Sequence, residues 1–137
     1  MNIEPQAELP NRERRTGNSK PLLIFVYGTL KRGLSNHSYL AGQRFVSEAR
    51  TRPEYRLFDL GGFPGMVHAA TDGLSIEGEI WEIDETCLHG LDRLEDVMGG
   101  EYERAIIALA PPFDDEKIEG YIYLRSVAGR RDAGSVW

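Results

Sequence analysis

The sequence of 137 residues lacks several features that would place it in a protein class at once. It has one cysteine, Cys87, so no intramolecular disulfide can form, and this agrees with a reducing compartment such as the cytoplasm. No apolar stretch approaches the ~18 residues that a transmembrane helix needs. The net charge is −6 and not basic, so neither nucleic acid nor a membrane surface is an expected partner. We therefore expect a soluble, cytoplasmic protein.

The first 20 residues differ from the rest of the chain in composition. They are polar, contain no apolar segment of the kind found in a secretory signal, and show no periodic apolar residues. We expect residues 1–20 to be a disordered polar tail that folding does not require. Residues 21–137 are expected to form a single domain, which is long enough to bury a sizeable core.

Most of the sequence after residue 20 shows the patterns of short β-strands. Apolar and polar residues alternate in "LSIEGEIWEI", and β-branched or aromatic residues fill several other short runs. Two helices are expected, a short one within residues 35–42 and a longer one at 85–97 with Asp84 as its N-cap. The cluster "GGFPG" at 61–65 indicates a turn. The strands are expected at residues 22–27, 43–49, 54–60, 74–83, 101–109 and 118–125.

The order of these elements favours one fold class over others. Strands and helices do not alternate regularly, which argues against a doubly wound parallel sheet. No internal repeat is visible, so a solenoid or propeller is not expected. We predict an α+β, mainly β fold: a small, mostly antiparallel β-barrel, closed or half-closed, with a few short flanking helices.

The segment "FVYGTLKRGLSNH" at 25–37 is the first candidate for a binding site. Gly28 and Gly33 have the spacing of a phosphate-binding loop after a strand, but the lysine that would reach the terminal phosphates is missing, so a nucleotide is not expected. The N–H groups of Gly28, Thr29 and Leu30 can still turn toward one anionic or carbonyl oxygen. The alternative is a plain turn at the end of a strand.

Glu95 is the candidate for proton transfer. At helical spacing it falls beside an apolar stripe, and a carboxyl group in apolar surroundings has a raised pKa, which suits a proton carrier near neutral pH. The alternative is a rim glutamate paired with Arg93 or Arg104. The stripe consists of Cys87, Leu91, Leu94 and Met98.

Other chemistry finds little support in the residues. Cys87 and His89 stand two apart and point to different helix faces, and no second pair of ligands is evident, so no metal site is expected. No G-x-S-x-G nucleophile motif is present. Tyr102, Tyr121 and Tyr123 can line a pocket, although strand tyrosines usually serve packing.

Two separated segments together resemble one family. "YGTLKRGLSNH" at 27–37 and "LDRLEDVMGGEYER" at 91–104 resemble the motifs of the gamma-glutamylcyclotransferase-like proteins, most closely the gamma-glutamylamine cyclotransferase branch. "EGEIWEID" and "GYIYLR" also look like strands of that family, and the resemblance covers residues 22–125. One departure is Asp96, because many relatives have glycine at this position.

The resemblance implies an activity as well as a small β-barrel. The implied reaction is intramolecular cyclisation of a gamma-glutamyl amine or peptide, which gives 5-oxoproline and a free amine without metal or cofactor. It also implies that Glu95 is the general acid and base, and that the glutamyl end is bound by the loop Tyr27, Gly28, Thr29 and Leu30. We expect Tyr102 and Tyr123 to add contacts to this small-molecule substrate. The alternatives are a non-catalytic β-barrel that binds a small metabolite, and a purely structural barrel.

Overall fold

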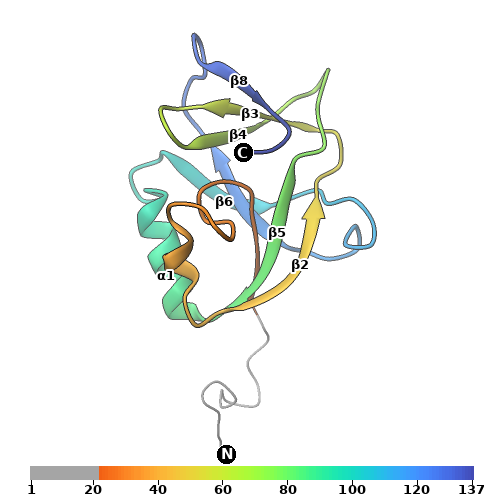
Figure 1. Cartoon of the computed structure of the whole chain (residues 1–137). Coiled ribbons are helices and arrows are strands. Elements are labelled where there is room, and N and C mark those ends of the chain that lie inside the picture. The colour runs from red at the N-terminus through yellow and green to blue at the C-terminus, as the bar shows by residue number, and fades with distance from the viewer. Residues whose placement is uncertain (1–21) are drawn as a thin grey trace, which may run out of the picture.

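The computed structural model describes residues 22–137, and the tail expected at 1–20 lies outside the described residues (Figure 1). This part of the chain consists of short strands and two short helical segments. In chain order they are β1 (Leu22–Val26), the 3₁₀ helix η1 (His37–Leu40), β2 (Arg44–Arg50), β3 (Tyr55–Asp59), β4 (Pro64–His68), β5 (Glu77–Ile83), α1 (Glu85–Leu94), β6 (Tyr102–Ile106), β7 (Glu119–Tyr123) and β8 (Arg131–Gly134).

The strands form two hydrogen-bonded sheets. One has five strands in the order β2-β5-β1-β7-β6, and the other has three in the order β4-β3-β8. Pairing is antiparallel throughout except between β1 and β7, which run parallel with Ile24 opposite Glu119. The mainly β, mostly antiparallel prediction is therefore confirmed. The predicted barrel is not confirmed, because the strands belong to two separate sheets and do not close on each other.

The central strand β1 explains how the core is divided. Its run of apolar residues is buried on both faces, as expected for a strand covered on two sides. Ile24 and Val26 face a cluster that includes Leu91 of α1, whereas Phe25 faces a cluster that includes Leu57 of the three-stranded sheet. Helix α1 and η1 cover one face of the five-stranded sheet, whereas the smaller sheet lies above α1 in Figure 1 and contributes to both clusters, Leu57 to one and Phe58 to the other.

Helix α1 begins where the sequence predicts and ends earlier. The Asp84 carboxylate accepts a hydrogen bond from the Cys87 N–H at 2.8 Å, which confirms Asp84 as the N-cap. The helix stops at Leu94, and Asp96 has a left-handed backbone with φ 52°, a conformation common just past a helix end. Met98 is therefore not part of the apolar stripe and is fully exposed, because the helical spacing does not continue that far.

Two strands of the smaller sheet have no clear sequence signal. The predicted turn at 61–65 overlaps β4, which starts at Pro64 on a sheet edge, where a proline costs no ladder hydrogen bond. The four residues of β8 are too short for a periodic pattern. None of the helices within residues 22–137 has the length and apolar character needed to cross a bilayer.

Candidate active site

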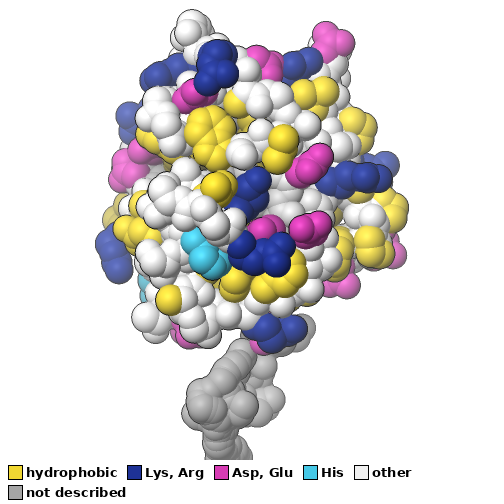
Figure 2. Space-filling view, in the orientation of Figure 1, with side chains coloured by type: hydrophobic (Ala, Val, Ile, Leu, Met, Phe, Trp, Pro, Cys, Tyr) yellow, Lys and Arg dark blue, Asp and Glu magenta, His cyan; other side chains and the backbone are white. Residues whose placement is uncertain are grey.

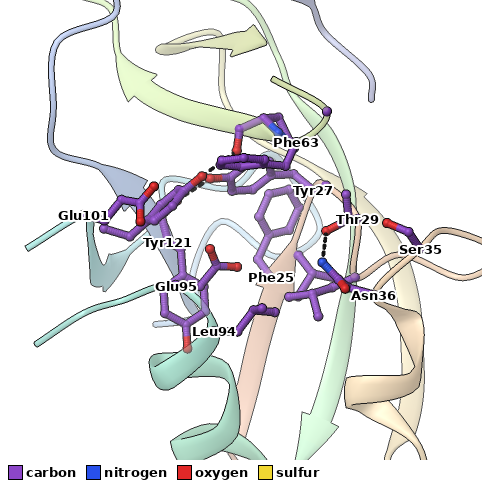
Figure 3. Close-up of a pocket in the computed structure, with 16 residues that line it drawn as sticks. Phe25, Tyr27, Thr29, Ser35, Asn36, Phe63, Leu94, Glu95, Glu101 and Tyr121 are labelled. Carbon is purple, nitrogen blue, oxygen red and sulfur yellow. Dashed lines mark hydrogen bonds between the residues drawn. The ribbon is translucent and has the colours of Figure 1, made fainter. Parts of the chain in front are cut away.

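A cavity of about 250 Å³ lies where the loop after β1, the end of α1, and strands β4, β6 and β7 meet (Figure 3). This volume is just below the range of about 300–1,000 Å³ that is typical of small-molecule sites. The segments that line it are far apart in the sequence. The lining residues are Phe25, Val26, Tyr27, Gly28, Thr29, Leu30, Ser35, Asn36, Gly62, Phe63, Pro64, Leu94, Glu95, Glu101, Tyr102 and Tyr121.

The loop after β1 is held by hydrogen bonds to its carbonyl groups and side chains. The Lys31 N–H donates to the Gly28 carbonyl at 3.1 Å. Asn36 donates to Thr29 twice, from its backbone N–H to the carbonyl and from its amide to the hydroxyl, both at 2.9 Å. The N–H groups of Thr29 and Leu30 donate to no other described residue. The loop is therefore held through its carbonyl and side-chain groups, and two residues that line the cavity have N–H groups without a partner among the described residues.

Glycine at position 28 is required by the close approach of strand β4. A Cβ atom built there would lie 2.6 Å from the Cγ atom of Pro64, which is far inside van der Waals contact. Pro64 is buried and lines the same cavity. Gly28 therefore lets two walls of the cavity meet.

Tyr27 lines the cavity with its ring and uses its hydroxyl group elsewhere. The hydroxyl donates to the Tyr121 carbonyl at 2.7 Å and accepts from the Met66 N–H at 3.2 Å. Burial, with a smaller contribution from the nearby Glu95 charge, raises the pKa of Tyr27 well above its usual value. Its hydroxyl thus joins β1, β7 and β4 as a neutral group, and only its ring is available to a ligand.

Glu95 is the residue just past α1, and its carboxyl group points into the cavity (Figure 3). Its backbone N–H donates to the Leu91 carbonyl at 2.9 Å, which keeps the residue aligned with the helix end. Within residues 22–137 its carboxyl group has no hydrogen-bond or ion-pair partner. Burial, and secondarily the negative charge of Glu101, raises the pKa of Glu95 from 4.5 to about 7. A carboxyl group with this pKa can both accept and donate a proton near neutral pH.

The alternative in which Arg104 neutralises Glu95 is wrong. Arg104 donates to both Asp92 carboxylate oxygens, from Nε at 2.9 Å and from Nη2 at 3.1 Å, and to Glu119 at 2.6 Å. Asp92 also accepts from the Tyr121 hydroxyl at 2.6 Å. Two carboxylates therefore balance the guanidinium charge, and this network joins α1 to β6 and β7 one turn before Glu95.

The strand tyrosines divide into two groups. Tyr102 and Tyr121 line the cavity, and their hydroxyl groups donate to the Pro64 carbonyl at 2.8 Å and to Asp92. Tyr123, which we expected at the substrate, is not among the lining residues. It is buried and packs edge-on against the Tyr102 ring with 5.2 Å between ring centroids. Tyr121 takes the place that the sequence led us to give to Tyr123.

Several lining residues were missed by the sequence analysis, Glu101 and Asn36 among them. The sequence did offer a signal for Asn36, because this residue falls within the segment 25–37 that was singled out as a candidate binding site. Glu101 offered none, because it begins the strand predicted at 101–109, and in the structure it precedes β6 in the turn after α1. Cys87 packs against the core, and burial raises the pKa of its thiol to about 11, which keeps it unreactive. No group of metal-ligating side chains occurs within the described range.

Comparisons with known proteins were consistent with one another. A family model described as gamma-glutamyl cyclotransferase, AIG2-like, matches residues 24–137. A Vibrio cholerae protein that is provisionally named gamma-glutamylcyclotransferase is 46% identical over 101 residues, which is 74% of this chain and 81% of that protein. Human gamma-glutamylaminecyclotransferase is 39% identical over 80 residues, or 53% of this chain, and this match spans only 52% of the human protein.

The folds also agree. The crystal structure of an AIG2-like protein from Mus musculus superimposes with a TM-score of 0.68 at 25% sequence identity. The match covers 87% of this chain and 90% of the mouse chain. The two-sheet arrangement described above is thus shared with a protein of the same family description.

Proposed function

The chain belongs to the AIG2-like gamma-glutamyl cyclotransferase family, and from this premise we propose that it cyclises a gamma-glutamyl amine or peptide to 5-oxoproline and a free amine. The observation that carries the proposal is the position of Glu95. An unpaired carboxyl group with a pKa of about 7 lines the same small cavity as a loop with free N–H donors.

The reaction needs little covalent chemistry from the protein. The substrate supplies its own nucleophile, the α-nitrogen, and its own electrophile, the γ-carbonyl carbon. The bond between them forms while the bond from the γ-carbon to the leaving nitrogen breaks. The α-nitrogen passes from NH₃⁺ to the lactam N–H, and the leaving nitrogen passes from amide N–H to RNH₃⁺. Two protons therefore move from one nitrogen to the other, with no change in oxidation state.

In this proposal Glu95 carries these protons one at a time. As a carboxylate it accepts a proton from the α-nitrogen, and as a carboxylic acid it donates a proton to the leaving nitrogen. A single well-placed acid and base of this kind contributes roughly 10²–10⁴-fold to the rate. The cavity also has to hold a flexible glutamyl chain in the curled geometry of a five-membered ring, which lowers the barrier further.

The loop at residues 27–30 is the proposed site for the glutamyl end. The N–H groups of Thr29 and Leu30 are free to donate to the α-carboxylate or to the oxyanion that develops on the γ-carbonyl oxygen. Their carbonyl groups are held by Asn36 and by contact with His37, so the donors need not reorganise during the reaction. We expect neither a metal ion nor a nucleotide to be required.

The experiment is to incubate the purified chain with a panel of gamma-glutamyl amines and peptides and to measure 5-oxoproline. We expect release of 5-oxoproline and the matching free amine in equal amounts from at least one compound. The Glu95→Gln variant should lose this release, whereas Glu103→Gln, the same change at an exposed position outside the cavity, should retain it. Binding of panel members without any 5-oxoproline would instead identify a metabolite-binding protein.

A further inference from the structure

The walls of the cavity carry two carboxyl groups that have no direct hydrogen-bond or ion-pair partner in the described chain. Two carboxyl groups, Glu95 and Glu101, line it, and none of the sixteen described lining residues is Lys, Arg or His. The side chain of Glu101 has no hydrogen-bond or ion-pair partner within residues 22–137. Glu101 is half-buried, so its charge is only partly screened by water. A ligand that brings a positive charge would be favoured here.

The position of Glu101 relative to the reacting atoms indicates which part of a substrate it meets. In Figure 3, Glu95 lies between Glu101 on one side and Thr29 of the loop on the other. If the loop holds the glutamyl end and Glu95 reaches the leaving nitrogen, the amine half extends past Glu95, away from the loop. Glu101 is then the carboxyl group on the amine side of the cavity.

We propose that Glu101 is a specificity-determining residue that selects gamma-glutamyl amines whose leaving amine carries a further, positively charged nitrogen. This inference rests on the function proposed above and adds the chemical class of the amine half. The cation pairs with the free Glu101 carboxylate in a partly buried site, where a charge-assisted hydrogen bond is stronger than on an open surface. An amine half that ends in a carboxylate is repelled by Glu101 and meets no lining cation.

Backbone structure at Glu101 does not depend on its side chain. Its N–H donates to the Asp96 carbonyl at 3.1 Å, and its carbonyl accepts from the Leu124 N–H at 2.9 Å. Glu101→Gln keeps both hydrogen bonds and removes only the charge. Glu103, two residues along on β6, is exposed and lies outside the cavity, so Glu103→Gln is the matched control.

The experiment uses three gamma-glutamyl amides built on the same four-methylene chain, which ends in an ammonium, a methyl or a carboxylate group. The measured quantity is kcat/KM for 5-oxoproline release. For the unaltered chain we expect the ammonium compound to exceed the methyl compound by about tenfold, equivalent to about 1.4 kcal/mol, with the carboxylate compound the slowest. In Glu101→Gln this ratio falls to about one, and in Glu103→Gln it is unchanged.

The ratio of the kcat/KM values for two substrates tests this inference separately from the cyclotransferase function. Any effect of Glu101 on the proton affinity of Glu95 acts on both substrates equally and cancels. Equal kcat/KM values for the ammonium and methyl compounds in the unaltered chain would overturn the inference while the cyclotransferase function stands. A ratio that survives Glu101→Gln, with both rates lowered together, would also overturn it and place Glu101 at the α-ammonium instead. No 5-oxoproline from any amide or from the panel would overturn both proposals.

Discussion

Replacing Glu95 with Gln changes the charge of the cavity while nearly preserving the shape of the side chain. In the folded chain the pKa of Glu95 is raised from 4.5 to about 7, whereas in the unfolded chain it has its ordinary value. Between pH 4.5 and 7 the folded state therefore binds more protons than the unfolded state. Stability must fall as the pH rises through this window, and the loss is complete above pH 7.

The size of this effect follows from the same two values. Their difference corresponds to at most about 3 kcal/mol of destabilisation by the ionised carboxylate above pH 7. Glu95→Gln removes this penalty but places an uncharged amide in the same half-buried position, which costs about 1 kcal/mol if the amide finds no partner. We expect the variant to be more stable than the unaltered chain at pH 8 by about 1–2 kcal/mol, and no more stable at pH 5.

Urea unfolding of both proteins at pH 5 and pH 8 measures this difference directly, and 5-oxoproline release measures the catalytic role. Turnover of the variant should fall by roughly 10²-fold or more with little change in substrate affinity. If the stability difference is the same at both pH values, the raised pKa of Glu95 is refuted. Near-normal turnover would refute its role in proton transfer, whatever the stability data show.

Three further outcomes are expected. Gly28→Ala should lower stability and abolish activity because its Cβ atom would overlap Pro64. Gly90→Ala, at a position with open space around it in α1, should instead raise the free energy of unfolding by ~0.5–1 kcal/mol. Melting temperatures that shift by the same amount in both variants would contradict this reasoning. Asp92→Ala should lower that free energy by about 2 kcal/mol, measured in urea, because Arg104 and a tyrosine hydroxyl lose an acceptor; a change under about 0.5 kcal/mol would argue against the network. Activity should survive exhaustive chelation and desalting, and a loss that a metal ion restores would reject the metal-free reaction.

Features that depend only on residues close together in the sequence could be predicted from the sequence by itself. Asp84 caps α1 because the hydrogen bond from its carboxylate spans only three residues, to Cys87. The central strand was evident because a run of apolar residues needs burial on both faces. The loop beginning at Gly28 was also identifiable, since its glycine and polar residues directly follow that strand.

Other features required the tertiary structure, even where the residues had been singled out. The sequence left Glu95 with Arg104 as a possible partner, and only the packing of α1 across β6 and β7 shows that Asp92 and Glu119 hold this arginine. Tyr121 and Tyr123 both lie in β7 and have the same local sequence pattern, but only Tyr121 lines the cavity. The separate sheets likewise could not be distinguished from a barrel by strand periodicity.

The sequence by itself determined that a carboxyl group would stand near the end of a capped helix and a glycine-containing loop would follow a buried strand. The tertiary structure decided that these two segments, some 65 residues apart, line one cavity and that Glu101 joins them there. The physical reason is that proton affinity depends on surroundings. Segments distant in the chain, including the loop at 27–30 and strand β7, bury Glu95, and the turn after α1 brings the charge of Glu101 beside it. The pKa of Glu95 is therefore a property of the fold and not of its local sequence.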